Sequence, residues 1–206
     1  MKFFVGKKVN MTQIFNAEGE VKAATAVAVP AVVVTQIKTK DKDGYAAVQV
    51  GFGAKKEKSI KKPARGHAKG LGNFEGFKEF RVAPDDASAL KVGDKVEMTT
   101  FKEGDSVAVS AISKGKGFQG VVKRHGFKGG SRTHGQKHSE REPGAIGGRG
   151  RAGGRVSKGM RMAGRMGGER ITVKGLKVLK IDGEGGLVYL SGAVPGRRGT
   201  LVEIRG

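Results

Sequence analysis

Three histidines, His125, His134 and His138, lie in one stretch of the chain. The last two are four residues apart, a spacing that places two imidazoles on one face of a helix in zinc peptidases. Gly135 stands where such an enzyme needs its glutamate, and the stretch is too rich in glycine to form a helix. The chain has no cysteine to add a thiolate ligand. We therefore predict no metal site, and we expect these histidines to stack on a base or hydrogen-bond to a phosphate.

A glycine pattern at residues 115–120 matches the G-x-G-x-x-G motif of nucleotide-binding proteins. A strand is expected before it, at 106–112, but no helix with an apolar stripe is expected after it. The nearest acidic residues, Glu140 and Glu142, lie inside a basic segment, where neither closes a nucleotide-binding βαβ unit. We interpret the pattern as a tight turn that directs neighbouring lysines towards phosphates, and a nucleotide-dependent enzyme remains the alternative.

Residues 113–170 concentrate the positive charge. They hold 15 Lys and Arg against 3 acidic residues, and 17 of the chain's 36 glycines. Within 126–159 the large apolar side chains are only Phe127, Ile146 and Val156, too few for a hydrophobic core. Glycine permits close approach of a backbone to another surface, and the arginine guanidinium matches the geometry of a phosphate. This combination predicts contact with RNA.

The residues that we predict to contact RNA are the basic side chains of this segment. They are Lys114, Lys116, Lys123, Arg124, His125, Arg132, His134, Lys137, His138, Arg141, Arg149, Arg151, Arg155, Lys158, Arg161, Arg165 and Arg170. No arrangement of nucleophile, base and oxyanion-stabilising groups is recognisable in the sequence. We therefore expect no catalytic residue, no cofactor and no small-molecule substrate.

The charge of the whole chain points to a polyanionic partner. Lys and Arg number 40 and Asp and Glu 19 in 206 residues, a formal net charge of +21, and each phosphate contacted by such a chain releases counterions. A membrane surface would require an amphipathic basic helix or a long apolar run. The longest apolar stretch, 26–34, is interrupted by Pro30. We expect a cytoplasmic protein without a secretory signal.

Short runs of β-branched residues are separated by turns that contain Gly, Asp or Pro, a pattern typical of a barrel or a sandwich. The expected strands lie at 24–29, 31–37, 46–52, 95–100, 106–112, 171–181, 187–190 and 200–204. No segment keeps a 3.6-residue apolar period over three turns, so long helices are not expected.

Several motifs resemble those of a known family, in the same order along nearly the whole chain. Residues 113–127 read Ser-Lys-Gly-Lys-Gly-Phe-Gln-Gly-Val-Val-Lys-Arg-His-Gly-Phe. Further matches lie at 5–15, 43–45, 66–67, 133–135, 143–147, 162–167, 169–173 and 192–196. Together they resemble the bacterial large-subunit ribosomal proteins of the L-three (L3) family.

The resemblance implies a mainly β fold, a translation-protein-type closed β-barrel with a small inserted segment and a long extended basic loop. We expect a single domain over 1–206, with the barrel from 1–53, 91–122 and 166–206. The insertion would be 54–90, and the extended rRNA-binding loop 123–165. The implied function is structural. The loop would thread 23S-type rRNA towards the peptidyl-transferase region, the protein would help nucleate assembly, and neighbours such as the L14 and L19 families would contact it.

Some positions depart from the family pattern. Gly148 stands where some members have glutamine, and His125 and Gly126 replace a bulkier Trp and Asn. The following residues are richer in arginine than the family pattern, which suggests different phosphate contacts near the loop tip. The second alternative to a ribosomal role is a free RNA chaperone, which would bind many nucleic acids alike.

Overall fold

The computed structural model describes residues 2–16, 18–147 and 153–206. The chain forms two compact units, one made of residues 1–112 and 170–206 and the other of 113–169. The chain leaves the first unit at the end of β7 (Ser106–Ile112) and returns at the start of β10 (Arg170–Asp182). Ile112 and Arg170 are register partners on these neighbouring strands. The second unit is therefore inserted between two paired strands of the first.

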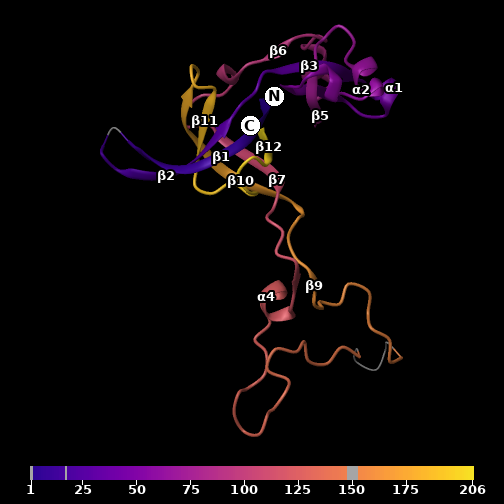
Figure 1. The fold of residues 1–206 in the computed structure, drawn as a ribbon, viewed down its shortest axis with the longest axis vertical. Helices are drawn as coiled ribbons and strands as arrows, with labels where there is room; N and C mark the ends of the chain where they lie inside the picture. The colour runs from indigo at the N-terminus through magenta and orange to yellow at the C-terminus, as the bar shows by residue number, and fades with distance from the viewer. Residues whose placement is uncertain (1, 17, 148–152) are drawn as a thin grey trace. The chain divides into compact units, whose positions relative to one another are not determined.

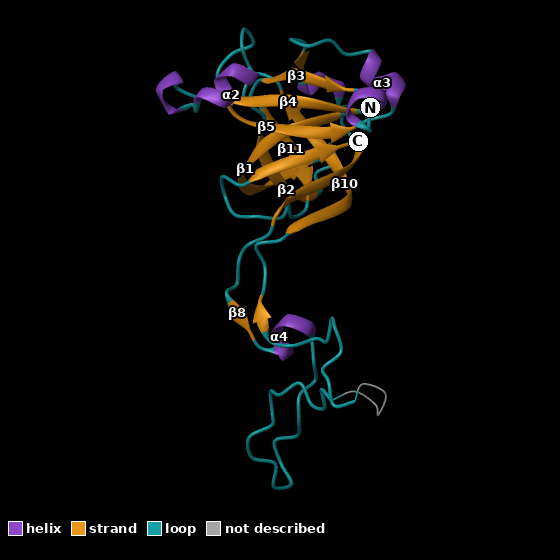
Figure 2. Cartoon of the chain, turned by 90° about the vertical axis from the view of Figure 1, so that its right-hand side faces the viewer, coloured by secondary structure: helices purple, strands orange, loops and turns teal. Residues whose placement is uncertain are grey.

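Six antiparallel strands close a barrel in the order β1-β12-β7-β10-β11-β2 (Figures 1 and 2). The remaining strands of the barrel are β1 (Phe3–Phe15), β2 (Val21–Ala28), β11 (Leu187–Ser191) and β12 (Leu201–Arg205). Valine, leucine, isoleucine and phenylalanine side chains fill the interior, as the β-branched runs of the sequence indicate. The prediction of a mainly β fold with a closed barrel is confirmed.

A second sheet of four strands, in the order β5-β4-β3-β6, lies against the barrel. Its strands are β3 (Val32–Lys38), β4 (Ala47–Ala54), β5 (Phe74–Arg81) and β6 (Lys95–Val96). The expected barrel segments 1–53 and 91–122 include β3, β6 and all but the last residue of β4, which belong instead to this second sheet. Short β-branched strands look alike in sequence, and only the long-range pairing decides which sheet they join.

Strand β1 contributes to two cores. Phe4 faces the barrel interior, while Phe3 and Val5 pack into the core of the second sheet. The rings of Phe3 and Phe80 stack with centroids 4.5 Å apart. Because alternate side chains of a strand point to opposite faces, the consecutive buried residues of β1 join the two layers.

The helices of the first unit are short. They are α1 (Lys40–Asp43), α2 (Lys62–His67) and α3 (Pro84–Ser88), with single 3₁₀ turns η1 (Glu57–Ser59) and η2 (Met98–Thr100). The sequence prediction of no long helix agrees with these lengths. Within the described part of the chain, no helix is long and apolar enough to span a membrane.

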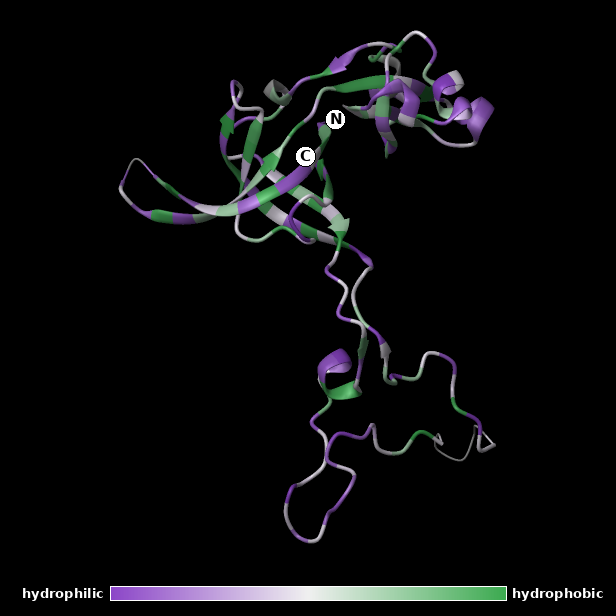
Figure 3. Cartoon of the chain, viewed as in Figure 1, coloured by the Kyte–Doolittle hydropathy of each residue, from purple (hydrophilic) through white to green (hydrophobic). Residues whose placement is uncertain are grey.

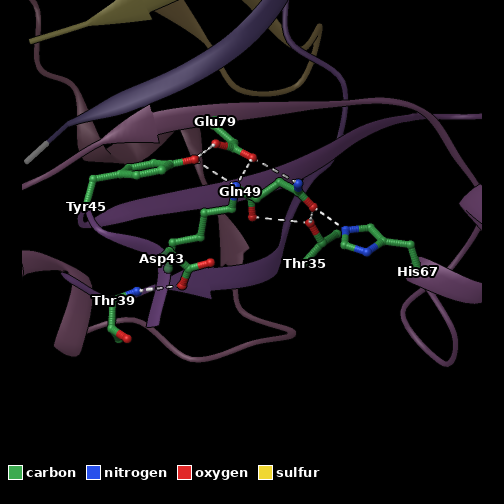
Figure 4. A network of polar contacts seen from close by, with 8 residues as sticks. Thr35, Thr39, Asp43, Tyr45, Gln49, His67 and Glu79 are labelled. Atoms are coloured by element: carbon green, nitrogen blue, oxygen red, sulfur yellow. Dashed lines mark hydrogen bonds and ion pairs between the residues drawn. The ribbon is translucent and has the colours of Figure 1, made fainter. Parts of the chain in front are cut away.

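A polar network crosses one face of the second sheet (Figure 4). Lys38 Nζ lies 2.7 Å from Glu79 Oε1 and donates a hydrogen bond of 2.8 Å to the Tyr45 hydroxyl. The Tyr45 hydroxyl in turn donates to Glu79 at 2.9 Å. The hydrogen bond from Lys38 lowers the pKa of Glu79 and raises the pKa of Lys38 above its ordinary value.

Candidate nucleic-acid interface

A two-stranded stem organises the second unit. Strand β8 (Phe118–Gln119) pairs with β9 (Gly164–Arg165) in antiparallel register. Further hydrogen bonds extend the stem, because Lys116 N–H donates to the Met166 carbonyl and Met166 N–H donates to the Gly117 carbonyl, each at 2.9 Å. The stem brings the two ends of the basic loop together mainly by backbone hydrogen bonds.

Glycine is required where the stem is tightest. Gly167 has φ +74°, and a Cβ atom at this position would overlap the carbonyl oxygen of Lys114. Ser113 N–H donates to the Glu169 carbonyl at 2.8 Å on the adjacent rung. The close approach of the two chains therefore depends on the absence of a side chain at Gly167.

Helix α4 (Val121–His125) follows the stem and ends at Gly126, whose φ is 72°. Its last two side chains hold the returning chain. Arg124 Nη1 donates to the Met162 carbonyl at 2.7 Å, and the protonated Nε2 of His125 donates to the same oxygen at 3.0 Å. Arg124 and His125 were predicted as RNA contacts, and these hydrogen bonds also give them a positioning role that the sequence did not suggest.

The other predicted cations of this unit that the structure describes are exposed. They are Lys114, Lys116, Lys123, Arg132, His134, Lys137, His138, Arg141, Arg155, Lys158, Arg161 and Arg165. Arg149 and Arg151 lie outside the described residues. Lys128, which the prediction omitted, is exposed in the same unit, and its place in the same basic run was the signal for it.

Little opposes this charge within the unit. Arg132 Nε lies 3.5 Å from Glu140 Oε2, and an ion pair between two solvent-accessible side chains contributes little to stability. Lysine and arginine side chains that keep their charge in solvent attract phosphates at long range. The second unit therefore presents a surplus of positive charge.

The second unit has almost no apolar interior. Val121 is the one large apolar side chain that is fully buried among the described residues of 113–169, and Phe118 is 76% exposed. Figure 3 shows the hydrophobic residues gathered in the strands of the first unit, whereas polar colouring predominates along 113–169. Such a segment gains little stability from its own packing and requires contacts with a partner.

The histidine pair His134 and His138 does not have the helical geometry of a zinc peptidase. His134 adopts a left-handed backbone conformation, with φ 61°, and Gly135 follows with φ 79°. The pair forms a turn rather than the helix that the H-x-x-x-H spacing would require. Among the residues that the structure describes, no cluster of three His, Cys, Asp or Glu could hold a metal ion.

Arg170 belongs to the barrel rather than to the loop. Its guanidinium donates two hydrogen bonds to Glu203, Nη1 to Oε1 at 3.1 Å and Nη2 to Oε2. Lys78 Nζ lies 3.0 Å from the same carboxylate. Arg170 was predicted to contact RNA from its position at the end of the basic segment, but its guanidinium neutralises a carboxylate in the barrel wall.

Comparison with known proteins identifies the family. The family model described as Ribosomal protein L3 matches residues 86–186. The chain is 48% identical to large ribosomal subunit protein uL3 of Herpetosiphon aurantiacus, over 97% of this chain and 93% of the relative. It is 44% identical to the same protein of Finegoldia magna, over 100% and 97%, and 48% identical to that of Roseiflexus sp., over 98% and 95%. The chain belongs to the ribosomal protein L3 family.

Membership of the L3 family confirms the resemblance that the motifs indicated. These relatives are large ribosomal subunit proteins, so the chain is a structural component of that subunit and not an enzyme. The glycine pattern at 115–120 belongs to the stem and the start of α4 in this L3 family member. The nucleotide-dependent alternative is thereby excluded.

A second basic surface of this L3 family member lies around α2. Lys62, Arg65 and Lys69 line a hollow of about 520 Å³ together with Gly70 and Asn73. These cations were not among the predicted RNA contacts. The lysine-rich run that precedes α2 and the i, i+3, i+7 spacing of Lys62, Arg65 and Lys69 were the available signals.

Proposed function

We propose that the chain binds large-subunit, 23S-type rRNA through the exposed cations of 113–169, helps nucleate subunit assembly and directs the loop 123–165 towards the peptidyl-transferase region. The observation that carries the proposal is a glycine-rich unit with a large excess of exposed positive charge and almost no apolar core. Outside the stem and α4, its backbone has little packing of its own and would be held in place by contacts of its side chains with phosphates.

The proposed mechanism separates two kinds of residue. Exposed lysines and arginines contact phosphates, and glycines let the backbone lie close to RNA. Arg124 and His125 fix the returning chain through Met162 and thereby position the contacts. The predicted Arg149 and Arg151 remain in the proposed contact set, while Arg170 is left out because Glu203 engages its guanidinium.

We further propose that residues 1–206 act as one rRNA-binding module in the cytoplasmic large subunit. The barrel fixes the origin of the loop, since its two ends leave from the paired strands β7 and β10. Neighbouring proteins such as the L14 and L19 families would contact the first unit. The hollow around α2 supplies a second set of phosphate contacts through Lys62, Arg65 and Lys69.

The test measures the affinity of the purified chain for 23S-type rRNA as a function of salt concentration. Replacing Lys123, Arg155 and Arg161 together by Gln is expected to lower the slope of log K against log salt by about 2–3, because each phosphate contact contributes roughly 0.7–0.9. The matched control replaces Lys22, Lys174 and Lys180, exposed lysines of barrel strands, by Gln. An equal decrease in slope in the two triple variants would contradict a specific role of the loop.

A second measurement separates the ribosomal role from that of a free RNA chaperone. Ribosomes are sedimented through a sucrose gradient at high salt, and the fractions are probed for the chain. Retention in the large-subunit fraction is expected, because a chain built into the subunit is buried between rRNA and neighbouring proteins, whereas binding through phosphate contacts alone weakens steeply as salt rises. Release to the top of the gradient would favour the chaperone.

A further inference from the structure

The β1–β2 hairpin continues beyond the barrel wall. Strand β12 pairs with β1 only from Phe3 to Lys7, and β11 pairs with β2 only from Ala24 onwards. In the described structure, residues 10–15 of β1 pair only with β2, and residues 21–23 of β2 pair only with β1. Residues 9–15 and 21–23 are here called the outer hairpin. Figure 1 shows this part of the hairpin projecting past the other barrel strands.

One face of the outer hairpin is apolar apart from Gln13, whose register partner is Ala23. Register partners on antiparallel strands share a face, and so do alternate residues of one strand. Thr25 is the register partner of Leu190 on β11, a residue of the barrel core, so Thr25 lies on the face that meets that core. Its register partner on β1 is Met11, which therefore lies on the same face of the hairpin. The same face therefore continues outward through Met11, Phe15 and Val21, which are 50%, 63% and 55% exposed. The face that elsewhere meets the barrel core has no covering layer here among the described residues.

The charge of the outer hairpin differs from that of the rest of the chain. Residues 9–22 contain one basic residue, Lys22, and two acidic residues, Glu18 and Glu20. The chain as a whole carries +21. Apolar side chains and carboxylates disfavour phosphates, so this surface suits a protein rather than RNA.

The backbone offers a second means of recognition. From Asn10 to Phe15, β1 has β2 on one side and, within the described residues, no strand on the other. An open strand edge pairs readily with an extended segment of another chain, and pockets for alternate side chains add specificity.

We propose that the outer hairpin is the docking surface for an extended segment of a second, basic protein of the large subunit. That segment adds a strand beside β1, covers Met11, Phe15 and Val21 with apolar side chains, and places Lys or Arg next to Glu18 and Glu20. The inference deepens the proposed contacts with neighbouring proteins and is independent of the proposed rRNA contacts.

The test uses a photo-crosslinking phenylalanine derivative in the full chain, assembled into large subunits in cells where the variant replaces the native protein. The derivative replaces Phe15 in one variant and Phe118, in the basic unit, in the control. The Phe15 probe is expected to link to a peptide of another subunit protein that contains Lys or Arg. A link to rRNA, to a second copy of the chain, to an acidic peptide or to nothing would overturn the inference. Failure of the Phe118 probe to link rRNA would instead contradict the proposed function.

A second measurement compares backbone amide exchange at residues 10–15 in the free chain and in the large subunit. We expect exchange to slow by about tenfold or more on assembly. The double variant Phe15→Ser/Val21→Thr should lose this protection, whereas Val92→Thr, at a valine that is 53% exposed elsewhere in the first unit, should keep it. Unchanged protection in the double variant would overturn the inference.

Discussion

Arg170 on β10 reaches across β7 to Glu203 on β12, where it forms a two-point ion pair with a side chain that is 7% exposed. Lys78 of the second sheet contacts the same carboxylate. A buried carboxylate costs free energy unless cations and hydrogen bonds compensate it. The two cations therefore tie β10 of the barrel and β5 of the second sheet to a single acidic group on β12.

Removal of the arginine leaves this carboxylate with one cation. Arg170→Met is expected to lower the free energy of unfolding by about 1–2 kcal/mol, less than for a fully buried pair because Arg170 is half exposed and Lys78 remains. The double variant Arg170→Met/Glu203→Leu should recover most of the loss. Unfolding in denaturant measures the free energies of unfolding of both variants. The slope of log K against log salt for rRNA binding should not change in Arg170→Met. A slope lower by about 0.7–0.9, the contribution of one phosphate contact, would contradict the exclusion of Arg170 from the interface.

The stem depends on Gly167. Gly167→Ala introduces a Cβ at positive φ and against the Lys114 carbonyl, so we expect the amides of Lys116 and Met166 to exchange faster and the affinity for rRNA to fall. Gly115→Ala is the matched control, because a Cβ at Gly115 meets nothing within 4 Å. Amide exchange by NMR or mass spectrometry measures the effect. Equal exchange in the two variants would show that the close approach at Gly167 is unimportant.

Two adjacent residues of α4 should respond differently to the same change. Lys123 is exposed, whereas Arg124 donates to the Met162 carbonyl. Lys123→Gln is expected to lower the slope of log K against log salt by about 0.7–0.9. Arg124→Gln should weaken binding with a smaller change in slope, because it loosens the returning chain rather than removing a phosphate contact. Titration of rRNA at several salt concentrations distinguishes the two, and identical slopes would contradict the positioning role.

The network of Figure 4 gives the first unit a defined pH dependence. The folded pKa of Glu79 lies below its unfolded value, so its contribution is present above about pH 4.3 and is lost as pH falls through the folded pKa. The folded pKa of Lys38 is raised, so its contribution is present below about pH 10.4 and is lost as pH rises further. Glu79→Gln should therefore reduce stability between these limits, and its effect should shrink as pH falls through the folded pKa of Glu79.

Thermal unfolding at several pH values measures this difference. The control is Glu184→Gln, at an exposed carboxylate in the turn before β11. The control should unfold like the wild-type chain throughout. A difference between wild type and Glu79→Gln that did not shrink at any acid pH at which the chain still folds would contradict the assignment, because the protonated carboxyl no longer pairs with Lys38.

The sequence predicted the secondary structure and the core-poor segment better than it predicted which strands pair with one another. Alternating β-branched residues indicated strands, and the shortage of apolar residues in 126–159 indicated a segment without a core. The assignment of β3 and β4 to the second sheet was missed, because periodicity does not record which distant strand provides the hydrogen bonds.

Charge patterning likewise predicted the basic unit but not the role of each cation. Arg124 and Arg170 lie among other basic residues, but Arg124 donates to a backbone carbonyl and Arg170 pairs with a buried carboxylate. Met162 and Glu203 lie 38 and 33 residues away from them in the chain. Contacts at such separations follow from the fold and leave no local pattern in the sequence.

The pairing of β1 with β12 has a consequence for the order in which the protein matures. Phe3 of β1 is the register partner of Arg205 of β12. Among the barrel strands, β1 is therefore translated first but pairs with β12, which is translated last. Until then Phe4 lacks Ile204 beside it, and the core that holds Phe3 and Val5 lacks Leu201 of β12. Pairing over so long a separation is slow, because the loop entropy must be lost before the contact forms. The basic unit is translated before the barrel can close, so a nascent chain exposes its cations to RNA while its hydrophobic strands are still unpaired.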